Sequence, residues 1–420
     1  MTPEEQAVIA TLRQPQAIRD RCQQLFDLCA ADQLENFACD LSQLDDVAAY
    51  VVATTQQLYP DFDVPFHSRW RHFDAGGEAR LAALDEALQG LSVEAAARSR
   101  LDLAIVSVLL DAGAGSQWRY HDAAADQVIG RSEGLAVASL RGFQAGCFSS
   151  DAAAPYQVDA VGLQNLTEAD LAALFQVSVD KPLVGLAGRL RLLHQLGQTL
   201  AAQPTRFGAP AHPGHLLDYW QTTFGSTLAA DTLLTEVLES FGTIWPGRVA
   251  IADTNLGDVW PHPALPQTGP GSNLVPFHKL SQWLTYSLVE PLQSAGLTVQ
   301  NLNALTGLAE YRNGGLMVDL GLLVPKHPAV TEASHRPSSP VVVEWRALTI
   351  SLLDLLGDRV RRQLKQTPEE LPLIKILEGG TWAAGRRIAK HLRPDTGAPP
   401  ITIQSDGSVF YPIPYGRGIP

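Results

Sequence analysis

Apolar side chains recur three and four residues apart through most of this chain, and that period restricts it to a mainly helical fold. Within residues 16–30, for example, the side chains at 18, 22, 25, 26 and 29 form one apolar stripe. Ser92, and Thr167 with Asp170 three residues later, are of the types that cap helix N-termini. The period predicts helices at 16–30, 44–58, 79–90, 93–111, 166–176, 183–202, 228–241, 276–293 and 343–366.

Strand patterns are few. Residues 399–413 alternate around an Asp406-Gly407 turn, which predicts a β-hairpin, whereas 248–253 and 315–324 fit either a strand or a helix. The Pro/Gly-rich connections keep apolar and aromatic residues and are expected to be ordered loops. We therefore expect a mainly α protein: a single large helical domain over residues 1–420, with the C-terminal hairpin as a small β appendage.

Composition and charge narrow the class of partner. Hydrophobic residues make up 45% and charged residues 18%, which suits a large interior. The formal net charge of -13 repels nucleic acid and acidic membranes, so a small molecule is the expected partner and an anionic one needs local positive charge. The N-terminus has no apolar signal segment, no apolar run approaches the ~18 residues that span a bilayer, and the cysteines match no zinc pattern. We expect a reduced, cytoplasmic protein.

The stretch VPFHSRWRHFDAGG is a local concentration of positive charge, with His67, Arg69, Trp70, Arg71 and His72 in six residues. Arginine offers paired donors to an anion, and the following glycines let backbone N–H groups approach it. The alternative is structural, because Arg and Trp side chains often fasten a loop to an acidic helix. A metal at His67 and His72 is disfavoured, since no third ligand is near in sequence.

Two other stretches carry candidate acids. In RLDLAIVSVLLDAGAG, Asp102 is expected in the first turn of a buried helix as a cap. Asp111 is expected at the C-terminal end, where the helix dipole disfavours an anion, so it needs a compensating partner or a function. In NLGDVWPHP, Asp258, Trp260 and His262 either frame a base or sugar or pack the loop.

Residues 275–324 hold a dense set of polar side chains. Lys279, Gln282 and Tyr286 fall on one helical stripe, which either binds a phosphorylated or polar ligand or is a solvated face. Glu310 stands beside an arginine and a Gly-Gly pair, so its carboxylate can approach a ligand. Residues 378–395 begin with Glu-Gly-Gly-Thr and continue as a basic helix, which either holds an anion at its N-terminus or exposes a charged face.

Seven stretches together resemble one known family: VPFHSRWRHFDAGG, LDLAIVSVLLDAGAG, GDVWPHP, LVPFHKLSQWLTYSLVEPL, LTGLAEYRNGGL, VVVEWRALTISLLDLL and LEGGTWAAGRRIAKHLRPDTGAPPITIQSDGSVF. From about residue 15 to residue 412 the chain is similar to the uracil-catabolism protein family of the fungal URC pathway, its fourth component or uracil-regulatable protein. The resemblance implies a role in a route that opens the ring of a uridine nucleotide and proceeds through ribosylurea-type intermediates to urea. Some members are described as uracil phosphoribosyltransferases, but this sequence lacks the apolar run, paired acids and Thr-rich Gly loop that grip phosphoribosyl pyrophosphate.

Residues 275–324 are also similar to two segments of the queuosine-nucleotide N-glycosidases, helical enzymes that split the N-ribosidic bond of a 5′-phosphorylated nucleoside. Their Phe-Tyr-Lys-Arg-Ala-Gln corresponds to residues 277–282, and their Ala-Asp-Tyr-Arg to 309–312, where Glu310 is one methylene longer than the aspartate. Such cleavage passes through an oxocarbenium-like state. It needs a stabilising carboxylate and a proton donor, and neither a metal nor a cofactor.

These resemblances and residue types predict a metal-free, carboxylate-assisted N-ribosyl hydrolase that acts on a ribosylurea- or uridine-type nucleotide and uses no cofactor. Glu310 or Asp111 is the predicted catalytic carboxylate. The predicted substrate-binding residues are His67, Arg69, Trp70, Arg71, Asp258, Trp260, His278, Lys279, Gln282, Tyr311 and Arg312. Two alternatives stay open: another uracil-pathway enzyme, either an amide hydrolase or a phosphoribosyltransferase, and a non-catalytic ligand-binding component.

Overall fold

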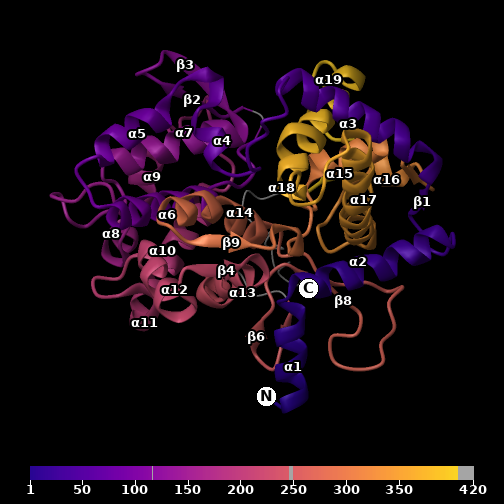
Figure 1. Cartoon of the computed structure of the whole chain (residues 1–420), viewed down its shortest axis with the longest axis horizontal. Helices are drawn as coiled ribbons and strands as arrows, with labels where there is room; N and C mark the ends of the chain where they lie inside the picture. The colour runs from indigo at the N-terminus through magenta and orange to yellow at the C-terminus, as the bar shows by residue number, and fades with distance from the viewer. Residues whose placement is uncertain (116, 246–248, 405–420) are drawn as a thin grey trace, which may run out of the picture.

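Helices dominate the computed structural model, which describes residues 1–115, 117–245 and 249–404 (Figure 1). The longer helices are α1 (Pro3–Leu12), α2 (Pro15–Ala30), α3 (Leu44–Leu58), α5 (Arg80–Leu88), α6 (Val93–Leu109), α7 (Arg131–Gln144), α9 (Glu168–Leu174), α10 (Leu186–Ala202), α12 (Leu216–Phe224), α13 (Ala230–Phe241), α14 (Lys279–Ser294), α15 (Tyr311–Asp319), α17 (Pro340–Leu364) and α19 (Trp382–Leu392). Single turns are α4 (Trp70–Phe73), α8 (Ala160–Asn165), α11 (Pro204–Phe207), α16 (Ala329–Glu332) and α18 (Leu373–Ile376). The expectation of a mainly α protein is confirmed.

Each of the predicted helices has a counterpart whose ends lie within three residues of the prediction. Both predicted N-caps are confirmed: the Ser92 hydroxyl accepts the N–H of Ala95, and Thr167 forms a reciprocal capping box with Asp170. Helices α1, α7, α12 and α15 were not predicted. The apolar period therefore locates the long helices well, because it is a local property of the chain.

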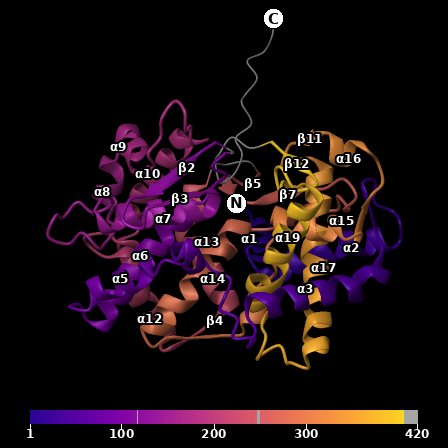
Figure 2. The ribbon, with the colours of Figure 1, turned by 90° about the horizontal axis from the view of Figure 1, so that it is seen from above.

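The helices lie in two groups (Figures 1 and 2). The first group contains α4 to α14, and the second contains α2 and α3 together with α15 to α19. The N-terminal helices α2 and α3 thus pack against α17, far away in sequence. One buried apolar cluster takes residues from both groups, among them Leu103 of α6 and Leu348 of α17.

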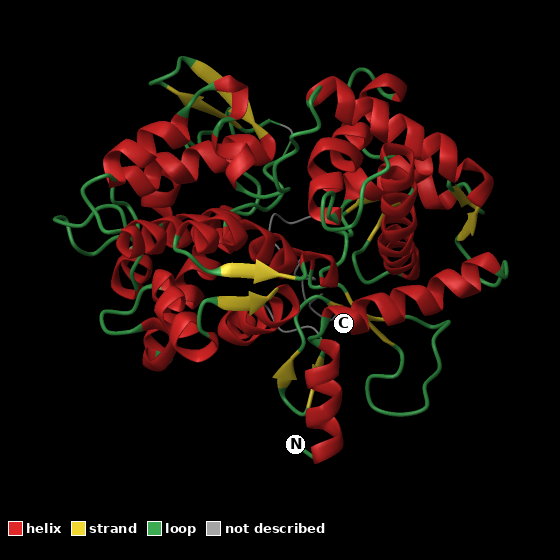
Figure 3. Ribbon diagram, viewed as in Figure 1, coloured by secondary structure: helices red, strands yellow, loops and turns green. Residues whose placement is uncertain are grey.

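The strands that the structure describes form two-stranded pairs between the helices (Figure 3). The antiparallel pairs are β1 (Phe37–Cys39) with β10 (Leu323–Pro325), β2 (Arg119–Asp122) with β3 (Gln127–Gly130), β5 (Ala250–Ile251) with β6 (Thr254–Asn255), and β7 (Val259–Pro261) with β8 (Leu274–Pro276). The parallel pairs are β4 (Thr227–Ala229) with β9 (Thr298–Gln300), and β11 (Ser334–His335) with β12 (Thr402–Ile403). The predicted C-terminal hairpin lies largely outside the described residues. Its first strand, as far as it is described, pairs with β11.

Asp102 is not where it was predicted. Because α6 begins at Val93, Asp102 lies in the middle of the helix and not in its first turn. Its buried carboxylate accepts hydrogen bonds from the main-chain N–H groups of Val158 (2.9 Å) and Gly214 (2.6 Å). It therefore fixes two distant loops to α6 instead of capping its own helix. Across the described ranges, no helix is both long enough and apolar enough to cross a membrane.

Candidate functional site

The basic stretch at 64–77 divides into residues that hold it in place and residues that surround a charged site. Trp70 donates its indole N–H to the carbonyl of Ser287 on α14 (2.8 Å). Arg71 donates to Glu290 of the same helix (2.6 Å), which also accepts from the Ser68 hydroxyl (2.7 Å). These contacts match the structural alternative, in which Arg and Trp fasten the loop to an acidic helix.

Arg69, from the same stretch, holds Asp111. The Arg69 side chain is fully buried, with Nη1 3.1 Å from Asp111 Oδ2. The Ser132 hydroxyl donates to the other carboxylate oxygen (2.6 Å). Burial acts to raise the pKa of Asp111, but the charge of Arg69, followed by smaller contributions, holds it below its usual range. Asp111 follows the C-terminus of α6, and Arg69 is the compensating partner that this position requires.

His72 completes this group as a neutral side chain. Its Nδ1 lies 3.2 Å from Arg69 Nη1 and 3.1 Å from the Ser132 hydroxyl. Burial and the charge of Arg69 lower the pKa of His72 to about 4. The imidazole is therefore uncharged at neutral pH and adds no positive charge next to Asp111.

Glu310 is the second candidate carboxylate and caps α15. It accepts the backbone N–H groups of Arg312 (2.8 Å) and Asn313 (2.6 Å). Burial raises the pKa of Glu310, against the opposing effect of these hydrogen bonds and of the charges of Lys279 and His67. The carboxyl group thus holds a proton more readily than an exposed glutamate does.

Lys279 connects the two carboxylates. It is the first residue of α14, and its backbone N–H donates to Asp258 Oδ2 (3.0 Å). Besides the stronger influences named above, its positive charge lowers the pKa of both Asp111 and Glu310. Within the described part of the chain, no hydrogen bond or ion pair occupies its Nζ atom. The ammonium group is therefore available to a ligand that lies between the carboxylates.

His67 lies on the Glu310 side of this site. Its Nδ1 is 2.6 Å from Glu378 Oε2, and its ring centroid is 4.7 Å from that of Trp283 and 6.0 Å from that of Trp382. Glu378 belongs to a π-helical turn, η6 (Leu377–Thr381), a distortion that is frequent at functional sites. The sequence analysis did not single out Glu378, Trp283 or Trp382. The Glu-Gly-Gly-Thr-Trp motif was the available signal for two of them.

Tyr311 and Arg312 extend the site outward from Glu310. The Tyr311 side chain is 50% exposed, and the Arg312 guanidinium lies 5.3 Å from its ring centroid. Arg312 itself is buried and donates to the carbonyl of Gly397 (2.8 Å). A half-exposed ring next to a carboxylate gives the site an aromatic wall.

Asp258, Trp260 and His278 are also buried, but their polar atoms bond to the protein. Both carboxylate oxygens of Asp258 pair with Arg346 (2.8 and 2.6 Å), and one also accepts the indole N–H of Trp260 (2.7 Å). Burial opposes the ionised form, yet the charge of Arg346 holds the pKa of Asp258 far below its usual range. His278 Nε2 lies 2.8 Å from the carbonyl of Leu12. The packing alternative for this loop fits these contacts.

The polar stripe of α14 separates in the same way. Gln282 donates to the Thr306 hydroxyl (2.7 Å), and Tyr286 donates to the Thr306 carbonyl (2.5 Å). Both side chains are fully buried, so the solvated-face alternative is wrong for them. They attach α14 to the segment before α15. Lys279 is the member of the stripe whose charge acts on Asp111 and Glu310.

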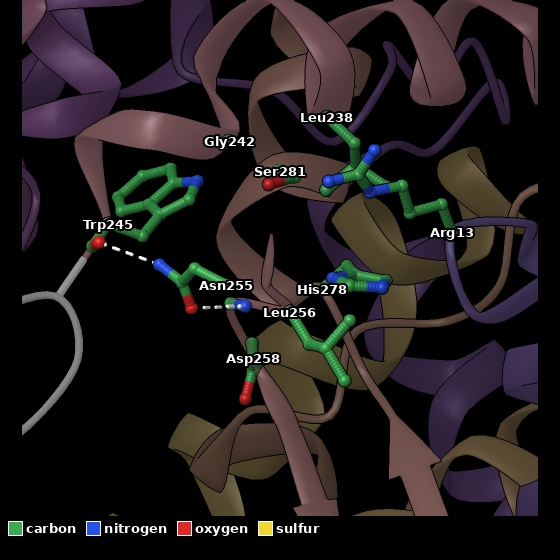
Figure 4. A pocket seen from close by; sticks show the side chains of 10 residues that line it. Arg13, Leu238, Gly242, Trp245, Asn255, Leu256, Asp258, His278 and Ser281 are labelled. Atoms are coloured by element: carbon green, nitrogen blue, oxygen red, sulfur yellow. Dashed lines mark hydrogen bonds between the residues drawn. The ribbon is translucent and has the colours of Figure 1, made fainter. Parts of the chain in front are cut away.

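Asp258 and His278 also line a small pocket with Arg13, Ser281 and Trp245 (Figure 4). Its volume of about 10 Å³ is close to the minimum that holds one water molecule. It is therefore too small for a nucleotide. Among the described residues, no group of three or more His, Cys, Asp or Glu side chains is arranged to hold a metal ion.

The fold and this site together define a mainly helical protein in which the charge of one lysine, Lys279, acts on two carboxylates of different environment. Residues 11–410 match the DUF1688 family, which is described as a protein of unknown function, and the chain belongs to that family. It is 41% identical over 412 residues to Protein urg3 of Schizosaccharomyces pombe, covering 96% of this chain and 99% of that protein. It is 37% identical over 429 residues to Uracil catabolism protein 4 of Lachancea kluyveri, covering 94% and 97%. The predicted family resemblance is confirmed.

Proposed function

We propose that this protein acts in uracil catabolism and hydrolyses the N-ribosidic bond of a ribosylurea- or uridine-type nucleotide. The pathway is supported by near full-length similarity to a relative named Uracil catabolism protein 4. The reaction is supported above all by one observation: Asp111 is paired with Arg69 at 3.1 Å, whereas the described hydrogen bonds of Glu310 come from backbone N–H groups, and the pKa values of the two acids are displaced in opposite directions. Pairs of acids that are separated in this way take different roles in acid–base catalysis.

Each carboxylate has a role that follows from its environment. Asp111, held in its ionised form by Arg69, stabilises the positive charge that develops on the ribose and orients the attacking water. Glu310, whose pKa is raised by burial, gives its proton to the leaving nitrogen. The bond between the anomeric carbon and that nitrogen breaks, water supplies the new C–O bond, and its proton passes to a carboxylate.

The site also offers groups that suit the rest of a nucleotide. Tyr311 provides a half-exposed ring for a planar or sugar group, and Lys279, whose ammonium has no partner among the residues described, can bind an oxygen of the ribose or the leaving group. Arg69 Nη2 is buried without a partner among the described residues, so a ligand atom or a bound water can complete its hydrogen bonds.

The test is to incubate the purified protein with ribosylurea 5′-phosphate and with uridine 5′-phosphate, and to follow urea, uracil and ribose phosphate. We expect release of ribose phosphate together with urea or uracil, abolished by Glu310→Gln and by Asp111→Asn. Glu236→Gln is a suitable control, because that buried carboxylate pairs with Arg206 in another part of the molecule. Tight binding of either compound without any release would contradict hydrolysis and favour a ligand-binding component.

A further inference from the structure

Two arginines from the two helix groups meet at one short segment. Arg131, the first residue of α7, donates Nη2 to the carbonyl of Thr396 (3.2 Å). Arg312, in α15, donates Nη1 to the carbonyl of Gly397 (2.8 Å). Because these carbonyls belong to consecutive residues, the two guanidinium groups lie close together. A carbonyl is neutral, so neither contact removes a positive charge.

A third arginine, Arg386 of α19, joins them. A Cβ atom on Gly385 would lie 2.2 Å from the carbonyl oxygen of Arg312, so α19 lies directly against α15 at this point. Arg386 pairs with Glu133, two residues after Arg131 on α7. Burial lowers the pKa of Arg312, and the positive charges of Arg131 and Arg386 lower it further, which fits three neighbouring cations.

The charge of this arginine cluster, Arg131, Arg312 and Arg386, is only partly compensated. Glu133 pairs with Arg386, while the described residues give Arg131 and Arg312 backbone carbonyls as partners and no carboxylate within ion-pair distance. In a chain with a net charge of -13, a local surplus of positive charge attracts anions that the rest of the molecule repels. The surplus also lies at the N-terminus of α7, where the helix dipole adds positive potential.

Two members of the arginine cluster are stacked on aromatic rings. The Arg312 guanidinium lies 5.3 Å from the Tyr311 ring centroid, and that of Arg386 lies 4.8 Å from the Trp382 ring centroid. A stacked guanidinium keeps its in-plane N–H groups for hydrogen bonding, which is the geometry that suits phosphate oxygens.

We propose that the arginine cluster binds the phosphate group of the substrate. The inference rests on the proposed function for the remainder of that substrate, a pentose joined to nitrogen. Glu310 and Arg312 are two residues apart, so their Cα atoms are separated by at most about 7 Å. A pentose phosphate can therefore place its anomeric carbon at the carboxylates and its phosphate at the arginines.

The experiment is isothermal titration calorimetry with ribose 5-phosphate, ribose and inorganic phosphate as probes. We expect ribose 5-phosphate to bind at least about tenfold more tightly than ribose, with an affinity that falls as salt is added. Arg131→Gln should weaken ribose 5-phosphate by about tenfold or more and leave ribose unchanged. Because Arg131 is exposed, this variant should fold normally.

Arg387→Gln is the matched control. Arg387 is an exposed arginine on α19 that contacts Gln57, away from the cluster, so its loss should change the affinity less than twofold. Equal affinity of the wild type for ribose and ribose 5-phosphate, equal effects of the two variants, or no binding of either phosphate probe would overturn the proposal.

Binding and hydrolysis separate this inference from the proposed function. If phosphate binding depends on Arg131 but no nucleotide is cleaved, the proposed phosphate site is supported and the proposed hydrolysis is contradicted. If hydrolysis occurs at the same rate with and without the 5′-phosphate, the reaction stands and the anion site is wrong.

Discussion

Two groups of polar side chains, one buried around Asp258 and one partly buried around Asp111 and Glu310, are linked through Lys279 at the N-terminus of α14, and they differ in how many of their polar atoms have partners. Asp258 Oδ1 accepts hydrogen bonds from Arg346 and Trp260, and Asp258 Oδ2 accepts them from Arg346 and the backbone N–H of Lys279. Around Asp111 and Glu310, the Lys279 ammonium lacks a hydrogen bond and Arg69 Nη2 lacks a partner, as far as the described residues go. The first constellation is complete without a ligand, and the second is not.

The backbone and the side chain of Lys279 therefore have different roles. The backbone of Lys279 is fixed by Asp258, while the charge of its side chain lowers the pKa of both Asp111 and Glu310. A saturated ion pair gives a helix a fixed position, while free donors in a partly buried site remain for a substrate. Acidic and aromatic residue types alone do not distinguish these two situations.

The largest expected effect is on stability and comes from Asp258. Asp258→Ala leaves the Arg346 guanidinium without its partner, and should lower the free energy of unfolding by about 3–5 kcal/mol. Because the folded pKa of Asp258 is lowered, this stabilisation is present above the ordinary value of 3.8 and is lost as the pH falls. Urea unfolding of the wild type and the variant at several pH values measures it.

Asp218→Ala is the control for that experiment. Asp218 pairs with Arg98 by two hydrogen bonds as well, but its side chain is 41% exposed. Its loss should cost less than about 1 kcal/mol. Equal costs for the two variants would show that the Asp258 pair has no special role in fixing α14.

In contrast to Asp258→Ala, Lys279→Met should leave stability nearly unchanged and strongly reduce activity. Its Nζ makes no hydrogen bond among the described residues, so the free energy of unfolding should change by less than about 0.5 kcal/mol. The rate constant kcat for nucleotide cleavage should fall by about 10²–10³-fold, because the charge between the carboxylates is lost. A variant that unfolds readily, or one that keeps full activity, would contradict the distinction drawn between the two constellations.

The pH dependence of kcat/KM sharpens the comparison further. Asp111 must be ionised, so activity falls as the pH drops through its lowered pKa. Glu310 must be protonated, so activity falls as the pH rises through its raised pKa. In Lys279→Met both limbs should move to higher pH, since the charge that favours both carboxylates is gone. If the acidic and basic limbs of the profile stay at the same pH in Lys279→Met, Lys279 does not influence the pKa values of Asp111 and Glu310.

The smallest effect is expected in the stretch that first suggested anion binding. Arg71→Gln removes a half-exposed ion pair with Glu290 and should cost about 0–1 kcal/mol of stability. Its affinity for ribose 5-phosphate should equal that of the wild type. A large loss of affinity, measured by calorimetry, would show that Arg71 contributes to binding of the phosphate.

Local patterns predicted most of the longer helices but missed several, among them α7 and α15. Gly314 and Gly315 lower the helix propensity of that segment, and tertiary packing outweighs it. A Cβ atom on Gly314 would lie 2.6 Å from Trp345 Nε1, so the glycine lets α15 approach α17. The prediction missed this helix because its reason lies in another part of the chain.

The candidate site shows the same limit. Asp111 was proposed from its place at a helix C-terminus, Lys279 from a polar helical stripe, and Glu310 from the arginine and glycines next to it. Glu378 was not, since its partner His67 is 311 residues away. Asp258 was among the predicted substrate-binding residues because the sequence shows an acid near a tryptophan. The sequence does not show that Arg346 pairs with both oxygens of that acid.

The contact of Gly385 with the Arg312 backbone has a mechanical consequence. Helices α15 and α19 pack closely there because residue 385 has no side chain, so we expect Arg312 and Arg386 to move together. Arg131 is on α7, in the other helix group (Figure 1). A hinge motion between the groups would therefore change the distance from Arg131 to the other two arginines and leave the distance between those two unchanged.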